Sequence, residues 1–372
     1  MALTTYGVND TLTAKVWARD LNREVTKGLE IAPLIGTGPN SIIQQKTELK
    51  SGGDRITVGL RMQLRGSGQT EGVVLQGNEE ALTTYSDNLF INELVHAVRS
   101  KGEDSIDQQR VLFDLREEGK MAMADWWAER LSLSFFIQAC GYTGTSITYR
   151  GTSTTIDARY TGLNAALAPS SNNVSYPSGA VNTDALVNAS TTSTFNFDTV
   201  VRAKEKAMTA NPKVRPVMVN GQPKYVMYIH PYQLVDLQLE AQATGSISWA
   251  DVQLAAITGG ELSGNPIYTG AAGEYNGVVL RVNEDVTTGV NASTGAELTN
   301  TRRAVLLGAQ ALLYGTSSKY SKDTPYKWVE EEFDYGRELG ISAQGLFGIK
   351  KTRFNSQDFG TIVCPTYAAA HS

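Results

Sequence analysis

Residues 56–65, ITVGLRMQLR, begin the most informative segment of the chain. Apolar side chains alternate there with polar side chains and glycine, which is the period of a β-strand with one covered face. Residues 66–72, GSGQTEG, follow with three glycines and no apolar side chain, so they can bend but cannot anchor themselves in a core. The chain returns through LFINELVHAVR at 89–99. Because a two-stranded ribbon is marginal alone in water, residues 53–99 are predicted to form a projecting arm that another copy of the chain covers.

The composition is that of a globular protein that avoids phosphate-rich partners. The chain has 372 residues, of which 41% are hydrophobic, and this is enough for two packed bodies. A formal charge of -5 argues against a surface built to bind phosphates. Any nearby DNA is therefore expected to be enclosed by the protein and not bound by a basic surface. Cys140 and Cys364 fit neither a disulfide framework nor a four-ligand metal site, and suit a reducing compartment. With no signal-like start and no apolar run near the ~20 residues of a membrane span, we expect a soluble protein without a membrane partner.

The strongest helical pattern follows the arm. Ser105 and Gln108 have the spacing of a capping box, and apolar residues recur near helical spacing to about residue 139. A helix of roughly 35 residues would be about 50 Å long, so it is predicted to act as a spine. Trp126 and Trp127 are adjacent on it, and without a basic groove beside them they are expected to pack in a core or interface.

The remaining segments divide by composition. Residues 1–50 suit an extended arm with a short amphipathic stretch at 13–21. Residues 141–194 are rich in Ser, Thr and Asn and are predicted to be a surface insertion. An α/β body is predicted after them, and strand-like runs return near the end. The body's predicted elements are helices at 198–209 and 232–241 and strands at 225–229, near 267 and at 278–282, and the terminal strand-like runs are at 304–307, 328–333 and 345–354.

No catalytic, metal-binding or cofactor-binding constellation is expected. The three histidines, at 96, 230 and 371, are far apart in sequence. The acidic run at 330–334 could hold a divalent cation, but such runs are more often solvated or subunit-facing. The kinase-like tripeptide at 358–360 lacks its companion motifs and is interpreted as a turn. A hydrolase using Asp236 or Glu240 near His230 is the enzyme hypothesis, although packing explains that helix better.

Several motifs together resemble a known family. They are GDRIT (53–57), GLRMQL (59–64), GNEEAL (77–82), VRS (98–100), FDLR (113–116), ADWW (124–127), IHP (229–231), FDYG (333–336) and GIKK (348–351). With them the chain resembles the major capsid proteins of tailed bacteriophages, in particular podovirus-like phages with large coat subunits. The resemblance spans nearly the whole chain, except residues 141–194.

The resemblance implies an α+β fold, the coat-protein fold shared by tailed phages and herpesviruses. Its parts would be an N-terminal arm (1–50), an extended β-hairpin loop (51–103), the spine helix of a peripheral domain (104–140), the insertion (141–194), an axial domain (195–315) and C-terminal strands that complete the peripheral domain (316–372). Hexamers and pentamers would close into an icosahedral shell around double-stranded genomic DNA, with no catalysis. The alternative is another self-assembling structural protein, such as a surface-array or tail component.

The resemblance also implies binding partners and a location. We expect a virion component assembled in the host bacterial cytoplasm, with a portal and a decoration protein as further partners. Because no long charged helical segment precedes the arm, the scaffolding protein is expected to be a separate chain. Some capsids of this fold join a loop lysine to a neighbour's asparagine, but residues 51–100 contain no lysine. No such cross-link is therefore expected, and the shell is predicted to depend on large interlocked interfaces.

Candidate interface residues follow from these placements. The extended-loop contacts with a neighbouring copy are predicted at Arg61, Gln63, Arg65, Gly66, Gly68, Glu71, Asn78, Glu79 and Glu80. Trp126 and Trp127 are assigned to packing of the spine. A peripheral-domain interface is predicted at Glu331, Asp334, Lys350 and Lys351.

Overall fold

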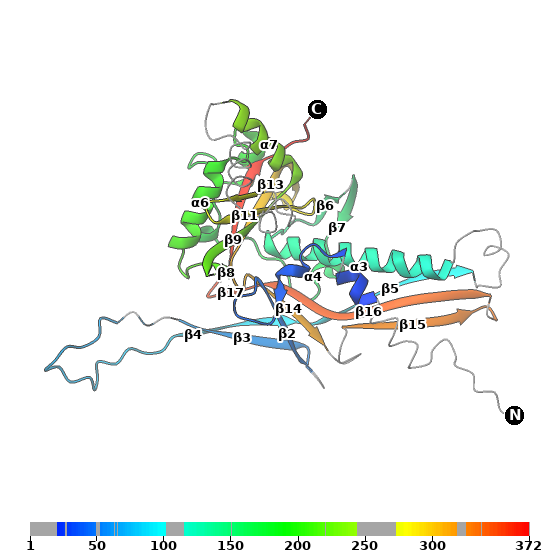
Figure 1. Ribbon diagram of the computed structural model, residues 1–372, viewed down its shortest axis with the longest axis horizontal. Helices are drawn as coiled ribbons and strands as arrows, with labels where there is room; N and C mark the ends of the chain where they lie inside the picture. The colour runs from blue at the N-terminus through cyan, green and yellow to red at the C-terminus, as the bar shows by residue number, and fades with distance from the viewer. Residues whose placement is uncertain are drawn as a thin grey trace.

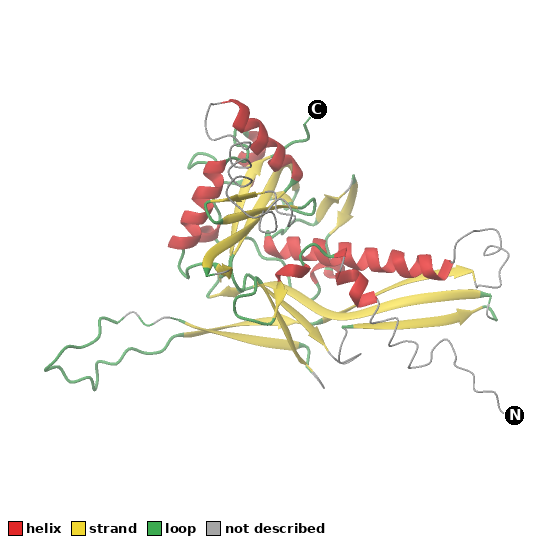
Figure 2. Ribbon diagram, in the orientation of Figure 1, coloured by secondary structure: helices red, strands yellow, loops and turns green. Residues whose placement is uncertain are grey.

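The computed structural model describes residues 21–26, 28–49, 53–62, 64, 66–101, 115–149, 151–219, 221–243, 273–317, 325–335 and 337–371. Within them the chain forms an elongated body built on one long helix, a second body with its own sheet, and a ribbon that projects sideways from their junction (Figure 1). Figure 2 shows that helices flank both sheets, whereas the ribbon has none along it. The architecture is therefore α+β.

The first sheet is organised by its longest strand, β16 (Glu338–Lys351). β5 (Asn92–Lys101) pairs with one edge of β16. β15 (Tyr326–Phe333) and β14 (Leu312–Ser317) follow one another along the other edge. The sheet is completed by β2 (Ile43–Leu49), which pairs with β14, and β1 (Ile35–Gly36). Successive β16 side chains mostly alternate between buried and half-buried, as in a strand with one covered face.

The long helix α3 (Leu115–Ala139) lies along this sheet (Figure 1). Its 25 residues give a length of about 37 Å. Met123, Trp127, Leu131 and Phe135 recur every four residues and are buried in the core against the sheet. The beginning of the predicted spine, residues 102–114, lies outside the described residues. None of the helices in the described ranges is long and apolar enough to cross a bilayer.

The projecting ribbon consists of β3 (Arg55–Arg61) and β4 (Thr84–Phe90), paired antiparallel. Only Ile91 separates β4 from β5, so one ribbon strand continues directly into the first sheet. Ile56, Leu89 and Ile91 pack with Leu313 in a small cluster at the ribbon's base. Beyond the paired strands, a loop that includes residues 66–83 extends away from both bodies (Figure 1).

The second sheet has the strand order β10 (Gly273–Tyr275), β11 (Val278–Val282), β9 (Gln222–Ile229), β13 (Glu297–Leu307) and β12 (Thr288–Val290). In addition, β8 (Val217–Val219) pairs with β9 and β19 (Thr361–Tyr367) pairs with β13. The flanking helices are α5 (Asp184–Ala189), α6 (Phe197–Thr209) and α7 (Pro231–Ala243). α6 begins after Asn196, whose side chain accepts the Thr199 N–H as an N-cap.

Short elements fill the connections. These are the turns of 3-10 helix η1 (Ala32–Leu34) and η2 (Ser171–Asn173), the hairpin β6 (Ser146–Tyr149) and β7 (Thr152–Thr155), α4 (Ala158–Thr161), and the hairpin β17 (Arg353–Phe354) and β18 (Gln357–Asp358). Asn355 and Ser356 have φ values of 50° and 60°, so the β17–β18 turn reverses the chain sharply.

Two placements differ from the sequence-based expectations. β15 and β16 lie in the first sheet, but β19 pairs with β13 in the second, because the β17–β18 turn redirects the chain. Residues 141–194 do not lie wholly on the surface either. Val174 bridges Val363, Thr194 bridges Tyr367, and Asp184 is buried. The polar composition of this segment suggests a surface position, but many of its polar side chains are buried and hydrogen-bonded inside the protein.

Candidate assembly surfaces and the buried polar junction

The loop at the end of the ribbon exposes large apolar side chains. These are Leu64, Val73, Val74, Leu75 and Leu82, and Val74 is 70% exposed. Solvated loops normally carry few such side chains, and an exposed apolar patch of this kind marks a surface for another protein. We call these five residues the loop patch.

Hydrogen bonds within the loop give it a defined shape. Glu80 Oε2 accepts the Gly66 N–H at 2.6 Å, and Glu79 Oε2 accepts the Gly77 N–H at 2.8 Å. Asn78 Nδ2 donates to Val74 O at 2.9 Å. The loop patch is therefore presented on an ordered turn, which lowers the entropic cost of docking it.

Most of the predicted loop contacts are exposed. The described ones are Arg61, Gly66, Gly68, Glu71, Asn78, Glu79 and Glu80. Gln63 and Arg65 lie outside the described residues. Gly68 has a φ of 71°, a conformation that a side chain would strain. Contact of these residues with a neighbouring copy stays a prediction.

The base of the ribbon is joined to the first sheet by polar contacts around Asp87 of β4. Lys350 Nζ lies 2.5 Å from Asp87 Oδ1 and donates to Asn88 O at 2.7 Å. The Arg353 N–H donates to Asp87 Oδ2 at 3.0 Å. Asp87 is 8% exposed, so water competes little with these bonds. They therefore hold the ribbon in a fixed direction relative to the first sheet.

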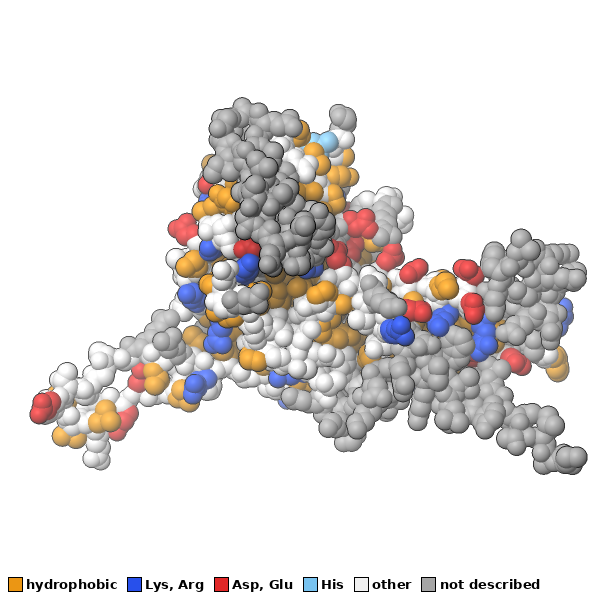
Figure 3. Space-filling model, in the orientation of Figure 1, with side chains coloured by type: hydrophobic (Ala, Val, Ile, Leu, Met, Phe, Trp, Pro, Cys, Tyr) orange, Lys and Arg blue, Asp and Glu red, His pale blue; other side chains and the backbone are white. Residues whose placement is uncertain are grey.

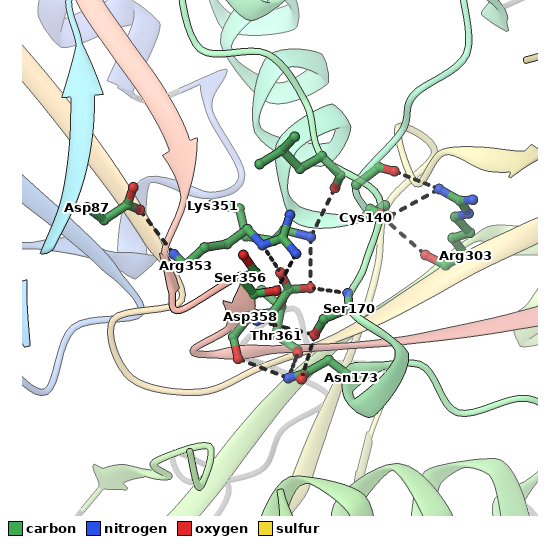
Figure 4. Close-up of polar contacts among 12 residues, drawn as sticks. Asp87, Cys140, Ser170, Asn173, Arg303, Lys351, Arg353, Ser356, Asp358 and Thr361 are labelled. Carbon is green, nitrogen blue, oxygen red and sulfur yellow. Dashed lines mark hydrogen bonds and ion pairs between the residues drawn. The ribbon is translucent and has the colours of Figure 1, made fainter. Parts of the chain in front are cut away.

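Lys351, the next residue, points into the subunit. Its Nζ lies 2.9 Å from Asp358 Oδ2, and Arg353 Nε lies 3.0 Å from Asp358 Oδ1 (Figure 4). The Ser170 N–H donates to the same carboxylate at 3.1 Å. Burial lowers the pKa of the Lys351 amine, and the neighbouring Asp358 carboxylate opposes that effect.

A second buried ion pair involves Arg303, which Figure 4 shows beside Cys140. Arg303 of β13 pairs with Asp184 of α5 at 2.7 Å, and Arg303 Nη1 donates to Gly141 O at 2.8 Å, just beyond the end of α3. Asn173 Nδ2 donates to Thr361 O at 2.9 Å. The two ion pairs and their partners therefore connect α3 and β16 to the second body. We call this set of contacts the polar junction.

The polar junction is not predicted from the sequence. Lys350 and Lys351 are both predicted at an outward interface, but consecutive strand residues face opposite sides, and the structure places Lys351 inside the subunit. Asp358 was interpreted only as part of a turn. The one available signal was the position of Arg303 within the apolar run that ends β13.

The acidic run on β15 has one buried member. Glu330 accepts from Arg116 Nη2 at 2.6 Å and from Trp328 Nε1 at 2.7 Å. Glu331 and Asp334 are exposed, and Asp334 makes a long contact, 3.7 Å, with Arg337. No group of three or more metal-ligating side chains occurs among the described residues.

The two spine tryptophans have different surroundings. Trp127 is fully buried and makes edge-on contacts with Tyr326 and Phe347, at centroid distances of 5.1 and 5.9 Å. Trp126 is half-buried and stacks on His96 of β5 at 4.1 Å. Both rings therefore join α3 to the first sheet.

The residues of the hydrolase hypothesis make separate local contacts. His230 Nδ1 accepts the Tyr232 N–H at 3.2 Å, and burial lowers the pKa of His230 to about 3. Asp236 Oδ1 lies 2.9 Å from His371 Nε2, and Glu240 accepts a bond from the Phe197 backbone. Within the described chain, no hydrogen bond joins His230 to either carboxylate. The contact on which the hydrolase hypothesis depends, between His230 and a carboxylate, is therefore absent from the described residues.

Comparison with known proteins gives a consistent result. The model of the family described as "Phage capsid protein" matches residues 5–370. The major capsid protein of Pseudomonas phage KPP25 is 25% identical over 368 residues, which cover 93% of each chain. The capsid of Ralstonia phage GP4 aligns with a TM-score of 0.75 and 28% identity over 91% of this chain and 90% of the other. The capsid of cyanophage Pam1 has the same fold, with a TM-score of 0.67 and 19% identity over 92% of each chain. These matches confirm the coat-protein fold predicted from the sequence.

Proposed function

The chain belongs to the phage capsid protein family, and from this we propose that it is the major capsid protein of a tailed bacteriophage. Copies join into hexamers and pentamers, which close into an icosahedral shell around the double-stranded DNA genome. The protein acts mechanically and is a component of the virion. The observation that carries the proposal is the ribbon, whose ordered loop exposes an apolar patch beyond the limits of its own body (Figure 1).

The exposed residues of the ribbon and of the β15–β16 turn supply the contacts between copies. Arg61 ends β3, and Glu71 and Asn78 lie in the loop that follows it. Glu331 in β15 and Asp334 in the turn after it lie at the other end of the first sheet. Lys350 and Lys351 act within the subunit and not between subunits. In capsid terms, the ribbon is the extended loop, α3 the spine of the peripheral domain, and the second sheet the centre of the axial domain.

Further partners follow from this role. A separate scaffolding protein, a portal and a decoration protein complete the particle, which is assembled in the host bacterial cytoplasm. The net charge of -5 supports a shell that encloses DNA without binding particular sequences.

The test is electron microscopy of the purified chain, expressed with and without its candidate scaffolding protein, at several ionic strengths. Closed shells or capsomer rings are the expected products. Flat sheets or tubes without closed shells under every condition would favour a surface-array or tail component instead. A chain that stays monomeric under every condition would overturn self-assembly altogether.

A further inference from the structure

A groove lies between the outer end of β3 and the segment that follows α6. Its volume is about 430 Å³. Its buried and half-buried lining is largely apolar, namely Leu60, Met62, Ala210, Pro212 and Phe359. Its exposed lining includes three cations, Arg61, Lys213 and Arg215. We call this feature the basic groove.

The three cations of the basic groove have no carboxylate partner within the described chain. Lys224, in contrast, is half-buried and paired with Glu274 at 2.6 Å. Arg215 has a ring contact only, with its guanidinium carbon 5.7 Å from the Phe359 ring centroid. The groove therefore combines an apolar surface with three uncompensated positive charges, which suits a partner with the opposite charge and an apolar centre.

The outer side of α3 has that pattern. Glu117, Glu118, Met121 and Asp125 recur at helical spacing and are exposed, and Met121 is 55% exposed. Gly119 marks the opposite side of the helix, since a Cβ there would lie 3.4 Å from Ile341 of β16. Acidic side chains gather along this part of α3 in Figure 3. None of the three carboxylates forms an ion pair with a described residue. We call these four residues the acidic face.

We propose that the basic groove of one copy receives the acidic face of a second copy. Met121 then packs on the apolar lining of the groove, and the three carboxylates lie opposite the three cations. This inference rests on the proposed function, because it names the surfaces through which neighbouring coat subunits meet. It is independent of the loop patch.

The arrangement of the subunit requires the two surfaces to come from different copies. The acidic face lies at the end of α3 farthest from the ribbon, whereas β3 and α6 lie on the other side of the molecule (Figure 1). A contact between two different surfaces of identical chains repeats from copy to copy and closes into a ring when the rotation fits. A nucleic acid could also neutralise the cations, but a phosphate backbone offers no counterpart to the apolar lining.

Cysteine cross-linking tests the contact directly. Cys140 and Cys364 are fully buried, so only introduced cysteines should react. The chains M121C and K213C, mixed, should give a disulfide-linked dimer, and the double variant a ladder of oligomers, on a non-reducing gel. The matched control pairs M121C with M208C, which changes an exposed methionine on α6 outside the groove lining, and should give no ladder.

The same samples are viewed by electron microscopy, which separates the two levels of the proposal. Shells or rings together with the M121C/K213C ladder support the contact. Shells without the ladder, or with an equal ladder in the control, overturn the contact and leave the capsid role intact. If the wild-type chain forms neither shells nor rings, the proposed function fails and the contact fails with it.

Charge reversal supplies a second test, whose result does not depend on whether two cysteines have the geometry to form a disulfide. K213E/R215E and E118K/D125K should each reduce the yield of assembled particles by about tenfold or more, as loss of close interfacial charge pairs does. Mixed together, the two chains should recover rings by alternating around an even-numbered hexamer. A pentamer has an odd number of positions and cannot alternate, so the mixture should give hexamers but few closed shells. Full assembly of either variant alone, or no recovery on mixing, would overturn the contact.

Discussion

Lys351 and Asp358 form an ion pair inside the subunit, with Nζ 2.9 Å from Oδ2 and side-chain exposures of 2% and 0%. The pair connects the end of β16 in the first sheet to β18, which leads into β19 of the second. Arg353 and the Ser170 N–H bind the same carboxylate, so its charge is compensated from several sides. Removing only one member of such a buried ion pair is costly, because the remaining charges are left without a partner and away from water.

Removal of the Asp358 charge should therefore destabilise the subunit strongly. D358N leaves Lys351 and Arg353 without their carboxylate, and we expect a loss of about 3–5 kcal/mol in the free energy of unfolding. Urea unfolding of the unassembled chain measures it. The control D334N changes an exposed aspartate and should cost less than about 0.5 kcal/mol. Equal stability of D358N and wild type would show that the junction does not hold the two bodies together.

Acid should weaken the fold through His230. Burial, assisted by Arg302, lowers the pKa of His230 from 6.5 to about 3. Between these values the unfolded state binds a proton that the folded state does not, so stability falls as the pH falls from 6.5 towards 3, by up to about 1.4 kcal/mol per pH unit. Above pH 6.5, His230 contributes no pH dependence to the stability of the fold.

The variant H230N isolates that contribution. Asparagine can still accept the N–H at the start of α7, so the helix cap should survive. Unfolding free energies of H230N and wild type, measured from pH 7 to pH 4, should diverge in favour of the variant as the pH falls. Parallel curves over this range would contradict the assignment.

The loop patch should matter for assembly and not for folding. V74D and L75D alter side chains that are 70% and 61% exposed in the single subunit, so its melting temperature should change little. The same charges would be buried at a subunit interface, so shell yield should fall about tenfold or more. L163D, at a similarly exposed leucine in the 141–194 segment, is the matched control. An undiminished yield of shells with V74D and L75D would show that the patch is not an assembly contact.

The shell should be held together without covalent bonds between subunits. The extended loop has no lysine within residues 51–100 to supply an isopeptide bond. Particles boiled in detergent should migrate as a single band near 40.3 kDa. A ladder of covalent multimers from wild-type particles would contradict this expectation.

Local patterns in the sequence predicted much of the fold. The alternation at 56–65 corresponds to β3 as far as Arg61, and the helical pattern corresponds to α3 from Leu115 onward. The helix expected at 198–209 is α6 within one residue. These elements follow from periodicity, which neighbouring residues determine. The capsid family itself was predicted from scattered motifs, and the family match confirms it.

Long-range contacts could not be predicted in the same way. Asp184 and Arg303 are 119 residues apart, and nothing in the sequence around either residue indicates that the two form an ion pair. Lys350 and Lys351 looked alike in sequence, but the strand turns one towards Asp87 and the other towards Asp358. The basic groove also joins distant segments, since Arg61 and Lys213 meet only in the folded chain.

The decisive experiment is a cryo-electron microscopy reconstruction of particles assembled from the purified chain. We expect a closed icosahedral shell in which the loop at 66–83 of each subunit lies on a neighbouring copy, with Val74 and Leu75 covered. A shell in which this loop extends into solvent, or particles that never close, would contradict it.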